Sequence, residues 1–278
     1  MSFDPRLTPA RPDLAAKHLQ GKVDAARFVE GKVREVIDAQ APVRRDPRPD
    51  AEQMTEALMG ERVTVYEFDD EGWAWGQLES DGYVGWLPAN ALIAPRAAPT
   101  HKVIAPRTFV FPGASIKLPP AVSPPLGSRL AVDRLDGPFA VSAIGFLPAS
   151  HVAPLAQNET DFVAVAERML GTPYLWGGKT DSGIDCSGLV QVALNACGLP
   201  CPRDSDMQEK ALGAPIDVAQ ARRGDLVFWK GHVAIVRDAA TLLHANAHHM
   251  AVAMEPLARA LTRISAAGSH ATCVKRLS

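Results

Sequence analysis

The sequence of 278 residues contains no long apolar run and no excess of basic residues. A membrane-spanning helix needs about 20 consecutive apolar residues, and a secretory leader needs roughly 7–15 behind a basic start. Neither pattern is present, so we expect a cytoplasmic protein that has no membrane partner. The formal net charge of −2 provides no positive surface for phosphate groups, so we also expect no nucleic-acid partner. Nothing in the composition indicates an oligomeric state.

Cysteine is scarce as well. The chain has four cysteines, and a cytoplasmic protein of this size does not need the two disulfides that they could form. Cys197 and Cys201 have a spacing that a zinc site could use, but no second close pair of Cys or His accompanies them. We therefore expect no metal and no cofactor, and we expect all but one of the cysteines to be small buried apolar residues.

The composition is otherwise that of a globular protein, with 47% hydrophobic and 22% charged residues, and the length suits about one to three domains. Residues 1–40 are predicted to form an N-terminal helical arm, because residues 13–39 mix alanine, valine and charge. Gly21 and Gly31 lie inside that stretch and weaken the helix prediction.

Two similar segments follow the arm. Short alternating apolar runs broken by Asp/Gly turns predict a small β-barrel over residues 41–96. The string GWLPANALIAP at 85–95 returns as GFLPASHVAP at 145–154, which indicates a second module over residues 97–156. Chance similarity in a chain rich in proline and alanine is the alternative. The second copy lacks the DDEGWAW turn and carries LPPAVSPPLG, so it could serve only as a spacer.

From residue 157 to residue 278 the pattern is that of an α+β domain. Residues 160–171 predict a compact helix, and residues 185–198 predict a second helix that ends at a glycine. The runs DLVFWK, HVAIVRD and TLLHA then predict three short strands joined by tight turns.

Cys186 lies at the start of the second predicted helix. Unpaired backbone N–H groups and the positive end of the helix dipole are expected there to lower the pKa of a thiol and favour the thiolate. Asp185 could cap the helix. Nearby glycines, such as Gly178 and Gly188, are expected to let the backbone approach a substrate closely.

A catalytic thiolate also needs a base. His232 opens one predicted strand, and His244 lies twelve positions later on what should be the adjacent strand. One turn between these strands would place the two histidines side by side, so that the second could hold the first in the correct tautomer. His248 and His249 are alternatives to His244 for this task, and each histidine could instead be purely structural.

Four ordered motifs carry a family resemblance: GTPYLWGG at 171–178, DCSGLV at 185–190, GDLVF at 224–228 and GHVAIV at 231–236. Together they resemble the NlpC superfamily of cell-wall cysteine peptidases. The preceding repeats resemble bacterial SH3-like domains. The layout is similar to γ-D-glutamyl-L-diamino acid endopeptidases, and it implies a papain-like catalytic domain, with helices packed on an antiparallel sheet, behind two small SH3-like β-barrels.

The resemblance also implies catalytic roles. Cys186 would attack the γ-amide carbonyl to form an acyl-enzyme, and His232 would move the proton from the thiol to the leaving amine. His244 would orient His232. The Tyr174 hydroxyl would help the Cys186 backbone N–H to stabilise the oxyanion.

Substrate contacts are implied for six further residues. Trp176 would line the pocket, while Asp185, Ser187 and Ser205 match positions that hold the γ-D-Glu carboxylate and the L-Ala end. Glu56 and Tyr83 of the first SH3-like module are candidates to hold the free ammonium of the peptide. The structural alternatives are that Asp185 only caps a helix, that Ser205 only starts one, and that Glu56 is a plain surface glutamate.

The function that follows is cleavage of the bond between γ-D-Glu and the diamino acid of murein peptides with a free N-terminal L-Ala, in cell-wall peptide recycling. The diamino acid itself, diaminopimelate or lysine, stays open. A papain-like amidase or acyltransferase acting on another substrate is one alternative. A non-catalytic adaptor that binds wall peptides is the other.

Overall fold

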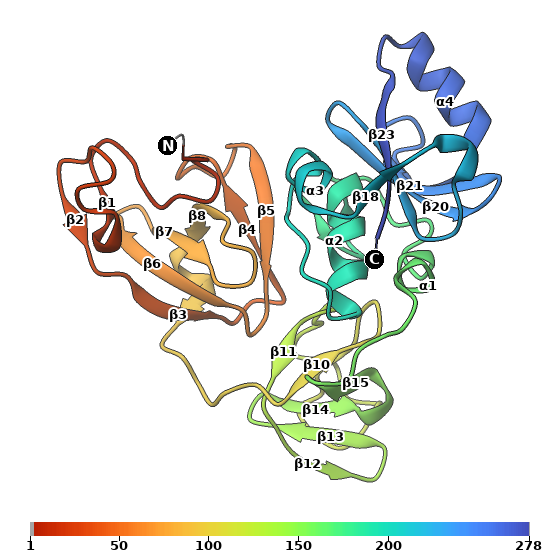
Figure 1. The fold of residues 1–278 in the computed structure, drawn as a ribbon. Helices are drawn as coiled ribbons and strands as arrows, with labels where there is room; N and C mark the ends of the chain where they lie inside the picture. The colour runs from red at the N-terminus through yellow and green to blue at the C-terminus, as the bar shows by residue number, and fades with distance from the viewer. Residues whose placement is uncertain (1–2, 278) are drawn as a thin grey trace. The chain divides into compact units, whose positions relative to one another are not determined.

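The computed structural model describes residues 3–277 and divides into two compact units, Met1–Ala156 and Gln157–Ser278. Figure 1 shows β-strands throughout the first unit, and helices beside a sheet in the second. This arrangement confirms the α+β class, with papain-like and SH3-like parts in the predicted order.

The helix expected within residues 13–39 is wrong. The segment instead holds β1 (Ala15–Ala16), the 3-10 turn η1 (Lys17–Leu19), β2 (Phe28–Val29) and β3 (Lys32–Val36), and β1 pairs with β2 in parallel. Gly21 adopts a φ of 77°, which a continuous right-handed helix does not allow. The first barrel therefore begins upstream of residue 41, because β3 belongs to its sheet.

The first SH3-like module is a seven-stranded antiparallel sheet in the order β5-β4-β8-β7-β6-β3-β9. Its remaining strands are β4 (Gln40–Arg44), β5 (Gln53–Leu58), β6 (Arg62–Phe68), β7 (Trp73–Leu78), β8 (Val84–Pro88) and β9 (Leu92–Ile93). Apolar residues that alternate along these strands fill one core. Leu14 of the N-terminal segment packs on Trp75 and Trp86, and the Arg11 guanidinium lies over both rings at 4.4 and 4.8 Å.

The second module is thinner and has two three-stranded sheets, in the orders β11-β10-β15 and β12-β13-β14. The strands are β10 (His101–Val103), β11 (Arg129–Leu130), β12 (Val132–Asp136), β13 (Phe139–Ser142), β14 (Gly145–Pro148) and β15 (Val152–Pro154). In both modules the repeated sequence forms a strand, a 3-10 turn and a strand. The turns are η2 (Ala89–Ala91) and η3 (Ala149–His151), and the proline before each has nearly the same backbone angles. The repeat is therefore structural.

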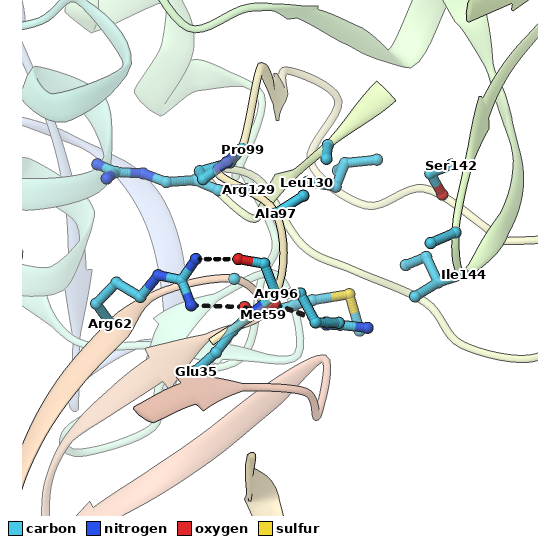
Figure 2. Close-up of a pocket in the computed structure, with 13 residues that line it drawn as sticks. Glu35, Met59, Arg62, Arg96, Ala97, Pro99, Arg129, Leu130, Ser142 and Ile144 are labelled. Atoms are coloured by element: carbon cyan, nitrogen blue, oxygen red, sulfur yellow. Dashed lines mark hydrogen bonds and ion pairs between the residues drawn. The ribbon is translucent and has the colours of Figure 1, made fainter. Parts of the chain in front are cut away.

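A pocket of about 170 Å³ lies in the first unit and is lined by both modules. Figure 2 shows Glu35 next to Arg62 and Arg96 on one side, with Leu130 and Ile144 of the second module on the other. Glu35 is thus paired with Arg62 and Arg96 at this pocket, and Leu130 and Ile144 of the second module contribute an apolar wall.

The second unit is built on a six-stranded antiparallel sheet in the order β18-β23-β19-β20-β21-β22. The strands are β18 (Ala214–Ile216), β19 (Asp225–Trp229), β20 (His232–Asp238), β21 (Thr241–Asn246), β22 (Ala251–Pro256) and β23 (Ala271–Arg276). The other elements are α1 (Phe162–Glu167), the hairpin β16 (Lys179–Thr180) and β17 (Gly183–Ile184), α2 (Cys186–Ala196), α3 (Ser205–Ala211), the turn η4 (Val218–Gln220) and α4 (Leu257–Ala266). In residues 3–277, no helix has both the length and the apolar character that a membrane crossing requires.

Local signals set the ends of the main helices. The Asp161 carboxylate caps α1 by accepting hydrogen bonds from Val163 and Ala164, but α1 ends at Glu167 rather than at the predicted glycine four residues on. The predicted helix at the second motif is confirmed as α2, with Gly198 at a φ of 73° just beyond its end. The three predicted strands are confirmed as β19, β20 and β21.

Candidate active site

Cys186 is the first residue of α2 and is 7% exposed. Burial raises the pKa of its thiol to about 12, and the neighbouring Asp185 carboxylate raises it further, while hydrogen bonds with the backbone of Val233 and Ser187 oppose the shift. The expected position is therefore right, but the expected lowering of the thiol pKa is wrong, because burial outweighs the helix start. The Val233 contact brings the thiol to β20, the strand that begins at His232.

His232 is likewise neutral in the free protein. Burial lowers the pKa of its imidazole to about 3, and the nearby His244 adds to the shift. A protein interior disfavours each charge, so the neutral thiol and the neutral imidazole coexist.

The two histidines lie side by side, as their strands predict. Strands β20 and β21 pair with Ile235 opposite Leu243, so His232 and His244 are diagonal neighbours on one face of the sheet. The His232 Nε2 atom lies 3.0 Å from the His244 Nδ1 atom. This bond uses Nε2 of His232 and leaves its Nδ1 for another partner.

A buried glutamate extends this row, and the sequence analysis did not find it. Glu255 of β22 is 2% exposed, and its Oε2 atom lies 3.2 Å from Nε2 of His244. Arg263 of α4 donates to both carboxylate oxygens, at 2.9 and 2.7 Å. These bonds lower the pKa of Glu255 to about 2. The segment AVAMEP gave no clear signal, because Ala251 and Ala253, which are in phase with Glu255, are only half-buried, and the partner depends on strand register.

The structure does not favour the alternative orienting histidines. His249 bonds through Nδ1 to the Asn246 side chain at 2.9 Å, and its ring meets the His244 ring edge to face. His248 is exposed, and its ring meets the His249 ring edge to face. Of the three candidates, it is His244 that forms a hydrogen bond with His232.

Tyr174 lies in the segment before α2, and its backbone N–H donates to the Met250 carbonyl at 2.9 Å. Burial raises the pKa of its hydroxyl, and the Cys186 side chain contributes to the rise, so the hydroxyl stays protonated and can donate a hydrogen bond near the sulfur. Trp176 is 58% exposed, which leaves its ring accessible to a ligand. Ser205 is half-buried and is the first residue of α3, which agrees with the alternative that it starts a helix.

Asp185 and Ser187 form one buried cluster with Arg203, which sequence reasoning gave no role. The Asp185 carboxylate caps α2 by accepting from the Gly188 N–H at 2.7 Å, and it also accepts from the Gly177 N–H at 2.9 Å. Arg203 is 1% exposed and donates to Asp185 at 3.0 and 2.6 Å and to the Ser187 Oγ at 2.9 Å. The capping role of Asp185 is thus confirmed, while its substrate role stays a prediction.

The glycines of this segment serve chain packing. A Cβ on Gly188 would lie 2.3 Å from the Gly178 carbonyl oxygen, and a Cβ on Gly178 would lie 2.4 Å from that of Gly183. Close approach of these backbones already requires glycine at both positions, and the expectation that Gly178 and Gly188 let a substrate approach stays a prediction.

Glu56 and Tyr83 both lie in the first unit. Glu56 of β5 is 3% exposed and accepts from the Gln40 side chain at 3.1 Å, so the description of it as a plain surface glutamate is wrong. Tyr83 is 1% exposed and belongs to the core of the first module. Their contact with a peptide ammonium stays a prediction.

One group of residues has the composition of a metal site. Ligand atoms of His244, His249 and Glu255 lie within 4.8 Å of one another. Both oxygens of Glu255 already accept from Arg263, and one also faces His244, so a cation would have to displace the arginine. Within residues 3–277, neither Cys197 nor Cys201 belongs to a group of potential metal ligands.

Two family models match the chain. Residues 171–264 match the NlpC/P60 family, and residues 43–92 match the bacterial dipeptidyl-peptidase Sh3 domain. The first match spans the cysteine, both histidines and Glu255, and the second spans Glu56 and Tyr83.

Relatives and a solved structure agree with these matches. The gamma-D-glutamyl-L-lysine dipeptidyl-peptidase of Bacillus subtilis is 31% identical over 219 residues, which is 69% of this chain and 71% of the relative. That of Bacillus cereus is 26% identical over 73% of this chain and 70% of the relative. Protein P54 of Enterococcus faecium is 43% identical over 94 residues, and the match spans 18% of that protein. The crystal structure of an NlpC/P60 family protein from Bacillus cereus has a TM-score of 0.74 at 20% identity and covers 88% of this chain and 99% of that chain.

Proposed function

The chain belongs to the NlpC/P60 family of cysteine peptidases, and from that premise we propose that it cleaves the bond between γ-D-glutamate and the diamino acid of short murein peptides with a free N-terminal L-Ala. The observation that supports the proposal is the hydrogen-bonded pair His232 and His244 on the strands next to which the buried Cys186 thiol lies, since the thiol contacts the backbone of Val233 on β20. The relatives named for γ-D-glutamyl-L-lysine peptides supply the substrate class.

The proposed chemistry runs through an acyl-enzyme. The Cys186 sulfur attacks the γ-amide carbonyl carbon while His232 takes the thiol proton, so the S–C bond forms as the S–H bond breaks. Burial raises the pKa of the thiol and lowers that of the imidazole, which favours a proton transfer that accompanies the attack. His232 then gives the proton to the leaving amine, and water releases the γ-D-glutamyl product. Tyr174 and the Cys186 N–H donate to the oxyanion.

The proposed substrate contacts are those that the family resemblance implies. Trp176 offers an exposed ring. Ser205 at the start of α3 would hold the acyl side of the substrate, as would Ser187, whose buried hydroxyl bonds to Asp185 and Arg203. Glu56 and Tyr83 would hold the peptide ammonium, which a carboxylate and a phenol suit chemically. The role in wall-peptide recycling, in the cytoplasm, is part of the same proposal, and cell fractionation tests its location.

The test is hydrolysis of a small peptide panel followed by mass spectrometry. The panel holds L-Ala-γ-D-Glu-L-Lys, its meso-diaminopimelate counterpart and the N-acetylated form of each. We expect the free peptides to be cut at the γ-amide and the acetylated ones to be cut at least about tenfold more slowly, since a charge-assisted contact is lost. We expect Cys186→Ala to lower the rate by at least about 10³-fold, while Cys197→Ala, the matched control, leaves it unchanged.

Other outcomes would select the alternatives. Faster turnover of an acetylated peptide or of a simple ester would favour an amidase or acyltransferase. Tight binding of the free peptides without any cleavage by the wild-type protein would favour an adaptor. Unchanged hydrolysis by Cys186→Ala would overturn the proposal itself.

A further inference from the structure

Three polar side chains form a hydrogen-bonded row across neighbouring strands of the second unit. His232 on β20 bonds to His244 on β21, and His244 bonds to Glu255 on β22. His244 lies opposite Ala253, so Glu255 is its diagonal neighbour on the same face. Helix α4 packs on this part of the sheet, and its Arg263 reaches the far end of the row.

Glu255, at one end of the row, determines which groups along the row donate and which accept. Arg263 donates to both oxygens of Glu255, which keeps this buried group an ionised carboxylate that can only accept. The Nε2 atom of His244 must therefore carry the proton. A neutral imidazole has one N–H, so the Nδ1 atom of His244 is a bare acceptor.

The tautomer of the His232 ring follows in the same way. His244 accepts through Nδ1, so the Nε2 atom of His232 must donate to it. The Nδ1 atom of His232 then carries the free lone pair, which is the form that a general base for a thiol needs. Burial keeps both rings neutral by lowering the pKa of His244 to about 4 and that of His232 to about 3.

We propose that Glu255, held by Arg263, is a positioning residue that sets the tautomers of His244 and His232 and so presents a basic Nδ1 atom to Cys186. The catalytic part of this inference rests on the proposed function, whereas the tautomers are a property of the free protein. The charged and titratable groups that face Glu255 are Arg263 from α4, His244 from β21 and His249 from the loop after it.

Glu255→Gln is the decisive variant, because the amide keeps the shape of the carboxylate but can donate through its NH₂ group. A glutamine can therefore stabilise the opposite tautomer of His244, with the proton on Nδ1, and this breaks the order of the row. We expect kcat on the cleaved tripeptide to fall about 10–100-fold, as is typical when a group behind a catalytic histidine is lost, with KM within about threefold. Glu255→Asp, which keeps the charge, should recover part of the loss.

The matched control is Glu35→Gln, which removes a buried carboxylate held by arginines in the other unit. Its kcat should stay at the wild-type value. Nitrogen-15 chemical shifts of the imidazole rings provide a readout that needs no substrate. We expect both histidines of the free wild-type protein to carry the proton on Nε2, and we expect Glu255→Gln to shift His244 toward the Nδ1–H form.

These two measurements separate the inference from the proposed function. If no peptide of the panel is hydrolysed, the chemical shifts still test the row. A wild-type His244 protonated on Nδ1, or a Glu255→Gln variant with wild-type kcat and a correct fold, would overturn the inference.

Discussion

Each unit of the molecule buries a glutamate against arginine, and the two clusters differ in where their contacts lead. Glu35 in the first unit accepts from the Arg62 side chain and from the side chain and backbone N–H of Arg96 (Figure 2). Glu255 in the second unit accepts from Arg263 and also faces a histidine. The carboxylate of Glu35 is thus structural, whereas the carboxylate of Glu255 ends the row that leads to the proposed catalytic histidine.

The difference also has a topological origin. Glu35 and Arg62 are direct cross-strand partners on β3 and β6, and such a pair contributes to sheet pairing. Glu255 lies on β22 beside β21, and its arginine comes from the helix that follows the strand. Burial and charge alone therefore do not identify a functional carboxylate. The identity of the further group that hydrogen-bonds to the carboxylate does.

The largest expected effect in this comparison comes from removing one arginine of each cluster. Arg263→Leu leaves Glu255 buried with only a neutral histidine and should lower the free energy of unfolding by about 3 kcal/mol. Arg62→Leu leaves Glu35 with both contacts from Arg96 and should cost about 1 kcal/mol. Hydrogen exchange of peptides from each unit, measured with increasing urea, reports the two stabilities separately. Equal losses would mean that the clusters are not different in kind.

A smaller effect concerns acid stability. Hydrogen bonds from Arg263 outweigh burial and leave Glu255 with a pKa of about 2, below the usual 4.5, so its contribution is complete above pH 4.5 and is lost as the pH falls toward 2. The corresponding stabilisation at neutral pH is about 3 kcal/mol, and roughly half should be gone by pH 3. The stability difference between the wild-type protein and Glu255→Gln should therefore shrink over this range. A difference that is constant from pH 6 to pH 3 would contradict the assignment.

The sequence predicted those parts of the site that depend on local signals. Cys186 at a helix start, the cap by Asp185 and the histidines His232 and His244 on adjacent strands each follow from a short motif. The pKa of the thiol did not follow, because burial is set by the whole unit and outweighs the local helix start.

Local sequence signals predicted neither the contact of Glu255 nor the structure of the N-terminal segment. The register that brings Glu255 to His244 depends on the turn before β22. In that turn Met250 adopts a left-handed φ of 50°, a conformation that a methionine in the sequence does not predict. The helix expected near the N-terminus was wrong because Lys32–Val36 pairs with a strand about 30 residues away, and such pairing overrides a weak local preference.

The central claim is that Cys186 forms a covalent intermediate with the γ-D-glutamyl part of the substrate, and intact-protein mass spectrometry after rapid acid quenching tests it directly. With L-Ala-γ-D-Glu-L-Lys, the account predicts a mass increase equal to L-Ala-γ-D-Glu minus water, located on the peptide that contains Cys186. Cys186→Ala should show no adduct, and Cys197→Ala should show the wild-type adduct. An adduct at another residue, or peptide hydrolysis by Cys186→Ala, would contradict the account.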